Sequence, residues 1–304
     1  MSQTASTLLM IRPVGFQYND ETASTNAFQH SESRRPDAQE RALREFNALV
    51  KLLRDHGMQV LTVDDTIEPH TPDSIFPNNW ISTHEEGLVV VYPMHAVNRR
   101  LERRADILQT LAERFVMYDI LDFTGSEKEQ QFLEGTGSMV LDRDTHLCYA
   151  CISPRTHKTL LQQFCNKLGY ELMAFNAFDE NHQPIYHTNV ILCLGEKFMV
   201  ICLDCIPDEE QKHRIVQSTS KEIIPISIDQ MNHFAGNMLE VHNTEGEKYI
   251  VMSSAAYEAL LPEQITRLEK YGRIIHSPIP TIESHGGGSV RCMLAEVFLP
   301  PKTS

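Results

Sequence analysis

A cysteine that follows three consecutive glycines is the strongest chemical signal in the sequence. Cys292 ends the run His285-Gly-Gly-Gly-Ser-Val-Arg-Cys292. Glycines permit unusual backbone angles and let a substrate approach the main chain closely. An apolar strand is predicted over 293–299, so the thiol should be exposed at a pocket, with Arg291 beside it favouring the thiolate. Cys292 is therefore the candidate nucleophile, and a buried structural cysteine is the alternative.

A histidine and a carboxylate occupy similar positions elsewhere in the chain. His187 directly precedes the apolar run 190–194 and has the chemistry of a general acid and base. Glu134 opens the glycine-rich turn Glu134-Gly-Thr-Gly-Ser138, where its carboxylate could orient the histidine and bind a substrate N–H. The alternatives are a histidine satisfied within the core and a carboxylate that only stabilises its turn.

Amide side chains stand at a third such position. Asn78 and Asn79 lie in Phe76-Pro-Asn-Asn-Trp80, and each offers donors and acceptors to a planar substrate group. An Asx turn is the alternative reading of this motif. His233, Asn237 and His285 lie near the same motifs, but nothing further in the sequence assigns them to a site.

The elements that must position these residues recur at intervals of roughly 50–60 residues. Each unit is predicted to contain a strand, a second strand, an amphipathic helix and a third strand. The four complete units are 80–83, 88–92, 98–114 and 115–118; 138–142, 147–152, 156–168 and 171–175; 189–194, 198–203, 208–218 and 222–226; and 237–242, 249–252, 255–271 and 273–276. A first unit comprises 8–13, 37–56 and 59–63. Five such units could close into a ring in which the motifs converge, whereas a generic α/β sheet does not explain the strand pairs.

The ordered set of motifs resembles the guanidino-group-modifying superfamily of the pentein fold, which includes arginine deiminases, dimethylarginine hydrolases and amidinotransferases. The resemblance covers nearly the whole chain, and the glycine-rich cysteine motif is its most specific part. Met10-Ile-Arg-Pro13 and Asn26-Ala-Phe-Gln29 make the sequence similar to the arginine-deiminase-related branch that includes citrulline hydrolases. The resemblance implies one catalytic domain over 1–304, folded as an α/β five-fold pseudosymmetric propeller around a central active site.

The resemblance also implies covalent catalysis without a cofactor or metal. Cys292 would attack the central carbon of the substrate, and His187 would protonate the leaving nitrogen and then activate water. Glu134 would bind a substrate nitrogen and orient His187. Arg155 matches a position that binds the α-carboxylate of an amino acid, a contact suited to a guanidinium fork; a surface arginine is the alternative.

The sequence departs from typical deiminases at two places where those enzymes carry aspartate. Asn78 or Asn79 stands at one of these places and Asn189 at the other. A buried guanidinium cation without counter-charge is expensive, whereas a neutral ureido group is less costly to desolvate. The predicted reaction is hydrolysis of citrulline to ornithine, ammonia and carbon dioxide. Arginine deimination, amidino transfer and a non-catalytic pentein binding module remain alternatives.

Composition narrows the class of protein. The 304 residues carry a formal charge of −14, and no basic run interleaved with aromatics appears, so a nucleic-acid partner is not expected. No apolar stretch is long enough to span a bilayer, and the first residues lack the features of a secretory signal. A cytoplasmic protein with a small-molecule amino-acid substrate is expected, and a homo-oligomer is left open.

Two further features concern the cysteines and one long loop. The seven cysteines suit a reducing compartment and free thiols. Two Cys-x-x-Cys pairs, 148/151 and 202/205, have the spacing of zinc ligands. Both fall in or at the end of predicted strands, where residues three apart point to opposite faces, so no metal site is expected. The polar stretch 19–39 is either a surface loop or a mobile lid over the active site.

Overall fold

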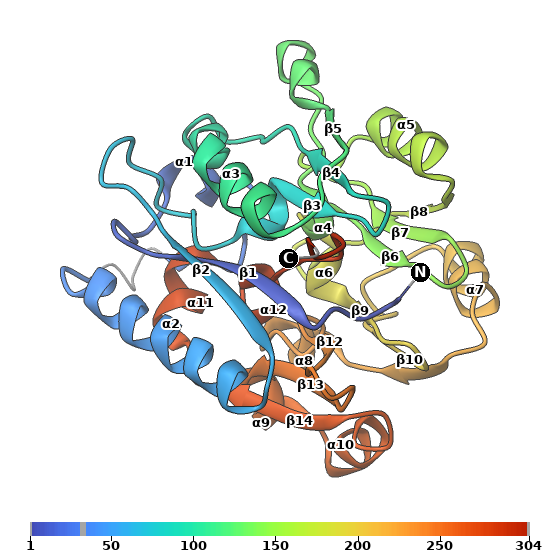
Figure 1. Cartoon of the computed structure of the whole chain (residues 1–304). Coiled ribbons are helices and arrows are strands. Elements are labelled where there is room, and N and C mark those ends of the chain that lie inside the picture. The colour runs from blue at the N-terminus through green and yellow to red at the C-terminus, as the bar shows by residue number, and fades with distance from the viewer. Residues whose placement is uncertain (1, 31–34, 303–304) are drawn as a thin grey trace.

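The computed structural model describes residues 2–30 and 35–302, and the strands within that part of the chain form five separate three-stranded sheets (Figure 1). All five share one connectivity, in which the central strand has one antiparallel and one parallel neighbour. Four sheets are continuous in sequence: β3 (Ile81–Thr83), β4 (Leu88–Val91) and β5 (Asp119–Asp122); β6 (Val140–Asp142), β7 (Leu147–Cys151) and β8 (Glu171–Phe175); β9 (Leu192–Leu194), β10 (Phe198–Ile201) and β11 (Glu222–Pro225); β12 (Leu239–His242), β13 (Lys248–Ser253) and β14 (Arg273–Ser277). The repeat predicted from sequence is confirmed as a set of sheets.

The remaining sheet joins distant parts of the chain. Its central strand β1 (Thr7–Arg12) pairs in parallel with β2 (Gln59–Asp64). Its antiparallel neighbour is β15 (Ala295–Glu296), with Leu8 opposite Glu296. The late strand β15 thus takes the place that β3, β6, β9 and β12 hold in the other sheets.

Longer helices connect the second and third strands of the units. They are α2 (Ala38–Asp55), α3 (Ala105–Arg114), α5 (Lys158–Leu168), α7 (Glu209–Gln217), and the pair α9 (Ser254–Ala259) and α10 (Pro262–Leu268). In α2 the buried residues Ala42, Phe46, Leu49 and Leu53 follow the spacing of a single apolar helix face. They pack with Leu8, Met10 and Val60 of strands β1 and β2. The apolar face of α2 therefore packs on the sheet whose strands the helix connects.

Short helical turns lie in the middle of the molecule. These are η2 (Pro77–Asn79), α4 (Gly135–Ser138), α6 (Thr188–Ile191) and α12 (Val290–Met293), and each precedes the first strand of a sheet. The turn α4 contacts both η2 and α6, and α12 contacts η2. In Figure 1 the turns α4, α6 and α12 lie centrally, while α2, α3, α5, α7 and α10 lie toward the outside. The remaining helical segments are α1 (Asp20–Ala23), η3 (Asn98–Glu102), η4 (Thr124–Glu129), α8 (Ile228–Asn232) and α11 (Pro280–Gly286).

Several predicted elements were wrong in extent. The helix predicted over 98–114 divides into Asn98–Glu102 and Ala105–Arg114, and the strand predicted over 189–194 contracts to Leu192–Leu194 after the turn α6. The strand predicted over 115–118 lies instead at Asp119–Asp122, because Phe115 bridges to Pro301 outside the sheet. The helix predicted over 255–271 is broken before Pro262, which starts α10 because proline suits the first turn of a helix and not its interior. The strand predicted over 293–299 contracts to Ala295–Glu296. None of the described helices has the length and apolar character needed to cross a membrane.

Candidate active site

A narrow pocket among the central turns brings most of the predicted residues together. Cys292, His187, Asn79 and Arg155 line it, and Gly286, Gly287 and Gly288 form part of its wall. Asn78, Asn189 and Glu134 are buried immediately behind the lining. The four motifs that were separate in sequence therefore converge on one place.

The Cys292 thiol is held by two amides. Its Sγ accepts hydrogen bonds from Nδ2 of Asn189 at 3.5 Å and from Nδ2 of Asn237 at 3.3 Å. Both amides hold the sulfur at a fixed position at the pocket, as a nucleophile requires. Cys292 lines the pocket as predicted, although only 3% of its surface is exposed. Packed against the pocket wall, it is reached through the pocket rather than from bulk solvent.

Arg291 does not support the thiolate. Its Nη2 pairs with the Glu296 carboxylate at 3.1 Å, and its Nη1 donates to the Leu294 carbonyl at 2.9 Å. Adjacent residues of the short helix α12 point in different directions, so the side chains of Cys292 and Arg291 contact different groups. The sequence prediction for Arg291 was therefore wrong.

His187 and Glu134 form a buried pair. Nε2 of His187 lies 2.9 Å from Oε2 of Glu134, and the other carboxylate oxygen accepts from the His95 backbone N–H at 2.9 Å. Burial lowers the pKa of His187 to about 4, against the opposing effect of Glu134. The imidazole is therefore neutral at pH 7, with Nε2 as the donor to Glu134 and Nδ1 available to accept a proton.

Arginines stabilise the charge of Glu134. Burial by itself would raise the pKa of Glu134, but Arg155, His187 and Arg99 outweigh it and hold that pKa well below its usual range. Arg155 Nη1 lies 3.6 Å and Arg99 Nη1 3.9 Å from Oε2 of Glu134. The carboxylate is thus ionised and fixed behind the histidine, as an orienting group requires.

Glycine at position 137 allows the histidine and an asparagine to approach. A Cβ there would lie 2.5 Å from Nδ2 of Asn79 and 2.7 Å from Nδ1 of His187. Any side chain at Gly137 would displace one or both. The glycine-rich turn after Glu134 is explained by this close packing.

The two adjacent asparagines have different surroundings. Asn79 accepts from Arg99 Nη1 at 2.9 Å through Oδ1 and donates to Oδ1 of Asn78 at 3.0 Å. Asn78 in turn donates to the hydroxyl of Thr136 at 3.3 Å. Asn79 lines the pocket and Asn78 does not, so Asn78 holds Asn79 in place rather than facing a substrate.

Asp73 and Arg99 also line the pocket, and neither was predicted from the sequence. Oδ2 of Asp73 accepts from Nδ2 of Asn19 at 2.7 Å and from the Thr22 hydroxyl at 3.2 Å, while the buried Oδ1 has no hydrogen-bond partner among the described residues. Arg99 is held by both oxygens of Glu102 at 2.8 and 3.0 Å. Asp73 precedes the Phe76 motif by only three residues, and that proximity was the available signal.

The polar stretch at 19–30 covers the pocket. Asn26 donates to the carbonyls of Gly286 and Gly287, both at 3.3 Å, and Gln29 donates to the His285 carbonyl at 2.9 Å. Nη2 of Arg155 donates to the Thr22 carbonyl at 3.0 Å. These contacts identify the segment as a cover over the site and contradict an ordinary surface loop; positions 31–34 of the predicted loop lie outside the described residues.

The other candidates fall outside the pocket lining. His233 is exposed and contacts the Asp229 carbonyl, and His285 lies within α11. Cys148 and Cys151 point into different core clusters, as their strand spacing requires. Across residues 2–30 and 35–302, no group of three or more histidine, cysteine or acidic side chains is arranged to hold a metal ion.

The chain matches a known protein family in sequence and several solved structures in fold. Residues 12–299 match the model of the family described as N,N dimethylarginine dimethylhydrolase, eukaryotic. No curated protein sequence matches the chain. ArgZ, an arginine dihydrolase from the ornithine-ammonia cycle in cyanobacteria, has a similar structure with a TM-score of 0.77 and 17% identity, covering 98% of this chain and 41% of ArgZ.

Two further structures share the fold. The N-terminal domain of an ArgZ variant bound covalently to a reaction intermediate has a TM-score of 0.75 and 18% identity, covering 97% of this chain and 99% of that domain. A dimethylarginine dimethylaminohydrolase adduct with S-methyl-L-thiocitrulline has a TM-score of 0.64 and 15% identity, covering 96% and 99%. The chain thus spans about two fifths of full-length ArgZ and nearly all of its N-terminal domain.

Proposed function

Since the chain belongs to the N,N-dimethylarginine dimethylhydrolase family of the guanidino-group-modifying pentein superfamily, we propose that it hydrolyses carbon–nitrogen bonds of a small ureido or guanidino amino acid. The proposed catalytic unit is a single domain over 1–304, with the five sheets arranged as a five-fold pseudosymmetric propeller. The shared connectivity of the sheets and the meeting of their short turns in the middle support this arrangement.

The proposed chemistry proceeds through a covalent intermediate on Cys292. Neutral His187 first takes the proton of the Cys292 thiol as Sγ bonds to the ureido carbon. His187 then gives this proton to the terminal nitrogen, whose bond to that carbon breaks as ammonia leaves. His187 then takes a proton from water, which adds to the thiocarbamate and breaks the carbon–sulfur bond. The N-carboxyamine released in this step loses carbon dioxide to give the amine. Glu134 orients His187 through the 2.9 Å contact.

The charged groups of the pocket suit the α-amino and α-carboxylate groups of an amino-acid substrate. The unpartnered oxygen of Asp73 is a buried acceptor for an ammonium group. Arg155, 2% exposed and stacked 5.0 Å over the Tyr186 ring, presents a fixed guanidinium for an α-carboxylate. These residues are proposed to bind the α-amino and α-carboxylate groups and so to place the substrate side chain toward Cys292.

Citrulline is the proposed substrate, and the polar environment of the nucleophile carries this choice. Within the described part of the chain, the hydrogen-bond partners of Cys292 Sγ are the amides of Asn189 and Asn237, with no carboxylate among them. Amides can donate to and accept from a neutral ureido group. They supply no counter-charge to a guanidinium, whose desolvation would cost several kcal/mol.

Arginine is the second candidate, and Asp73 is the observation that favours it. This carboxylate shares the pocket with Cys292, and if it faced the reacting group it would compensate a guanidinium. Successive hydrolysis of both terminal carbon–nitrogen bonds of arginine would release two molecules of ammonia, and loss of carbon dioxide would then give the same amine. The two readings differ in which end of the substrate Asp73 contacts.

A substrate comparison tests the proposal. Citrulline, arginine, N,N-dimethylarginine and agmatine are compared by the release of ammonia or dimethylamine and by the ureido or amine product that each would give, with the Cys292→Ala variant as control. Citrulline should have the highest kcat/KM, and the variant should be inactive toward every compound. Efficient turnover of arginine with inert citrulline would overturn the assignment, and residual activity in the Cys292 variant would overturn the mechanism.

A further inference from the structure

A second hollow lies against the same short elements that carry the candidate active site. It is narrow, with a cavity volume of about 30 Å³. Several of its lining residues are close chain neighbours of residues at the candidate active site. The pairs are Thr136 with Glu134, Met238 with Asn237, and Arg291 with Cys292. The two cavities therefore share the elements between them.

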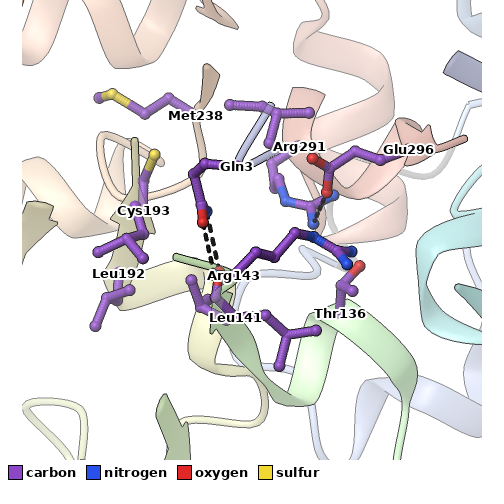
Figure 2. Close-up of a pocket in the computed structure, with 12 residues that line it drawn as sticks. Gln3, Thr136, Leu141, Arg143, Leu192, Cys193, Met238, Arg291 and Glu296 are labelled. Carbon is purple, nitrogen blue, oxygen red and sulfur yellow. Dashed lines mark hydrogen bonds and ion pairs between the residues drawn. The ribbon is translucent and has the colours of Figure 1, made fainter. Parts of the chain in front are cut away.

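Two guanidinium groups enter this hollow. Figure 2 shows Arg143 and Arg291 approaching from different elements, with their guanidinium groups next to each other in this view. Arg291 is paired with Glu296 at 3.1 Å. Arg143 is 4% exposed, and no carboxylate in the described part of the chain lies within 4.0 Å of its nitrogens. The charges that line the hollow thus comprise two cations and one anion.

The immediate neighbours of Arg143 do not supply the missing charge. Its guanidinium lies 3.8 Å over the Phe298 ring, and Nη1 lies 3.5 Å from Nδ1 of His84. Burial, together with the adjacent Arg143, lowers the pKa of His84 to about 3, so this histidine is neutral at pH 7. A ring face and a neutral imidazole leave the buried cation without a counter-ion, which is costly in a protein interior.

The backbone of Arg143 is held by Gln3, and its guanidinium is held against the Phe298 ring. The side chain of Gln3 donates to the Leu141 carbonyl at 3.0 Å and accepts from the Arg143 backbone N–H at 2.8 Å, as the dashed lines in Figure 2 show. The hydroxyl-bearing Thr136 stands on the wall nearest the guanidinium of Arg143. A preformed guanidinium fork matches the two oxygens of a planar oxyanion.

We propose that this hollow binds a small oxyanion, of the size of bicarbonate or acetate, between Arg143 and Arg291. The net positive charge of the lining excludes cations, and the narrow space excludes larger anionic metabolites. Binding there steadies α4 and α12, which also carry the candidate active site. The inference rests on the charges of the hollow and does not depend on the reaction proposed for Cys292.

Thermal unfolding of the inactive Cys292→Ala protein tests the site without any contribution from turnover. The midpoint is measured with sodium bicarbonate, sodium acetate or sodium chloride at constant ionic strength and pH. An oxyanion at ten times its Kd should raise Tm by about 3 °C relative to chloride. The midpoints are then measured in two double variants, in which Cys292→Ala is combined with either Arg143→Gln or Arg44→Gln. The Arg143→Gln substitution should abolish the rise in Tm. The Arg44→Gln substitution, which lies on the exposed face of α2, should preserve it.

Equal midpoints in all three salts, or an undiminished rise in the Arg143→Gln protein, would overturn the proposal. A measurement on the unaltered protein covers the case in which that variant does not fold. Line broadening of ¹³C-bicarbonate by the protein should be reversed by acetate as a competitor. Absence of broadening at millimolar bicarbonate would likewise overturn the proposal, and it would leave the substrate assignment untouched.

Discussion

Replacing His187 by glutamine tests the protonation state on which the proposed chemistry depends. Glutamine can place an amide N–H near the position of Nε2 and so keep a donor to Glu134, but it cannot titrate. In the folded protein burial lowers the pKa of His187 from 6.5 to about 4. Above pH 6.5 the imidazole is neutral in both the folded and the unfolded chain, and its titration does not affect stability.

The effect appears as the pH falls below 6.5. Between pH 6.5 and pH 4, His187 binds a proton in the unfolded chain but stays neutral in the folded protein. The free energy of unfolding therefore decreases as the pH falls to about 4. At roughly 1.4 kcal/mol for each tenfold difference in proton affinity, the total loss is about 3 kcal/mol, of which most is reached by pH 4.5. The His187→Gln protein lacks this contribution and should lose about 2–3 kcal/mol less between pH 7.5 and pH 4.5.

Equilibrium urea unfolding at several pH values between 7.5 and 4.5 measures the difference. Acidic groups and the other histidines titrate in both proteins, so their contributions cancel in the comparison. His213→Gln serves as a matched control, because His213 is exposed on α7, and it should follow the wild-type profile. If His187→Gln and wild type lose the same stability over this range, folded His187 is not held neutral and its assignment as the initial proton acceptor fails.

Three further outcomes follow from the same geometry. Glu134→Gln leaves two buried arginines without this carboxylate and should lower the free energy of unfolding by about 3–5 kcal/mol, measured in urea at pH 7.5; a loss below about 1 kcal/mol would contradict the buried charge network. Gly137→Ala should lower kcat at least about tenfold because its Cβ would collide with the His187 ring, whereas Gly125→Ala, which has open space around it, should leave kcat unchanged. Asn79→Asp should raise the ratio of kcat/KM for arginine to that for citrulline by about tenfold or more, since a carboxylate would compensate a guanidinium; an unchanged ratio would show that Asn79 does not select the charge of the substrate.

The repeat was predictable because local pattern and burial agree in most units. Pairs of short apolar runs, followed by one amphipathic helix, appear as such in the structure. One of the errors arose where a distant contact decides the outcome. Phe115 looks like part of a strand, yet its backbone bridges to Pro301, a contact that no local pattern contains. The break before Pro262 was visible in the sequence, because proline commonly occupies the first turn of a helix.

The site was predictable to the extent that its residues sit in glycine-rich turns. Glycine marks the turns that contain Glu134 and Cys292, where the chain passes close to other groups, whereas His187 was identified by its place directly before an apolar run. Asn237 follows Gly236, but nothing in the sequence assigned its amide to the site, and only the folded chain places that amide 3.3 Å from Cys292 Sγ. Arg99 belongs to a run of charged residues at a helix start that resembles many surface runs, and only the folded chain buries it against Glu102.

The place of Cys292 in the chain is explained by the strand that follows it. The sequence pattern predicts 293–299 as an additional strand that follows a complete fifth unit. In the structure β15 instead pairs antiparallel with β1, and so supplies the strand that the first unit lacks. The turn before β15 is then equivalent to the turns before β3, β6 and β9, which contribute Asn79, Glu134 and His187. A nucleophile late in the sequence reaches the same centre as those residues because the first and last segments build one sheet.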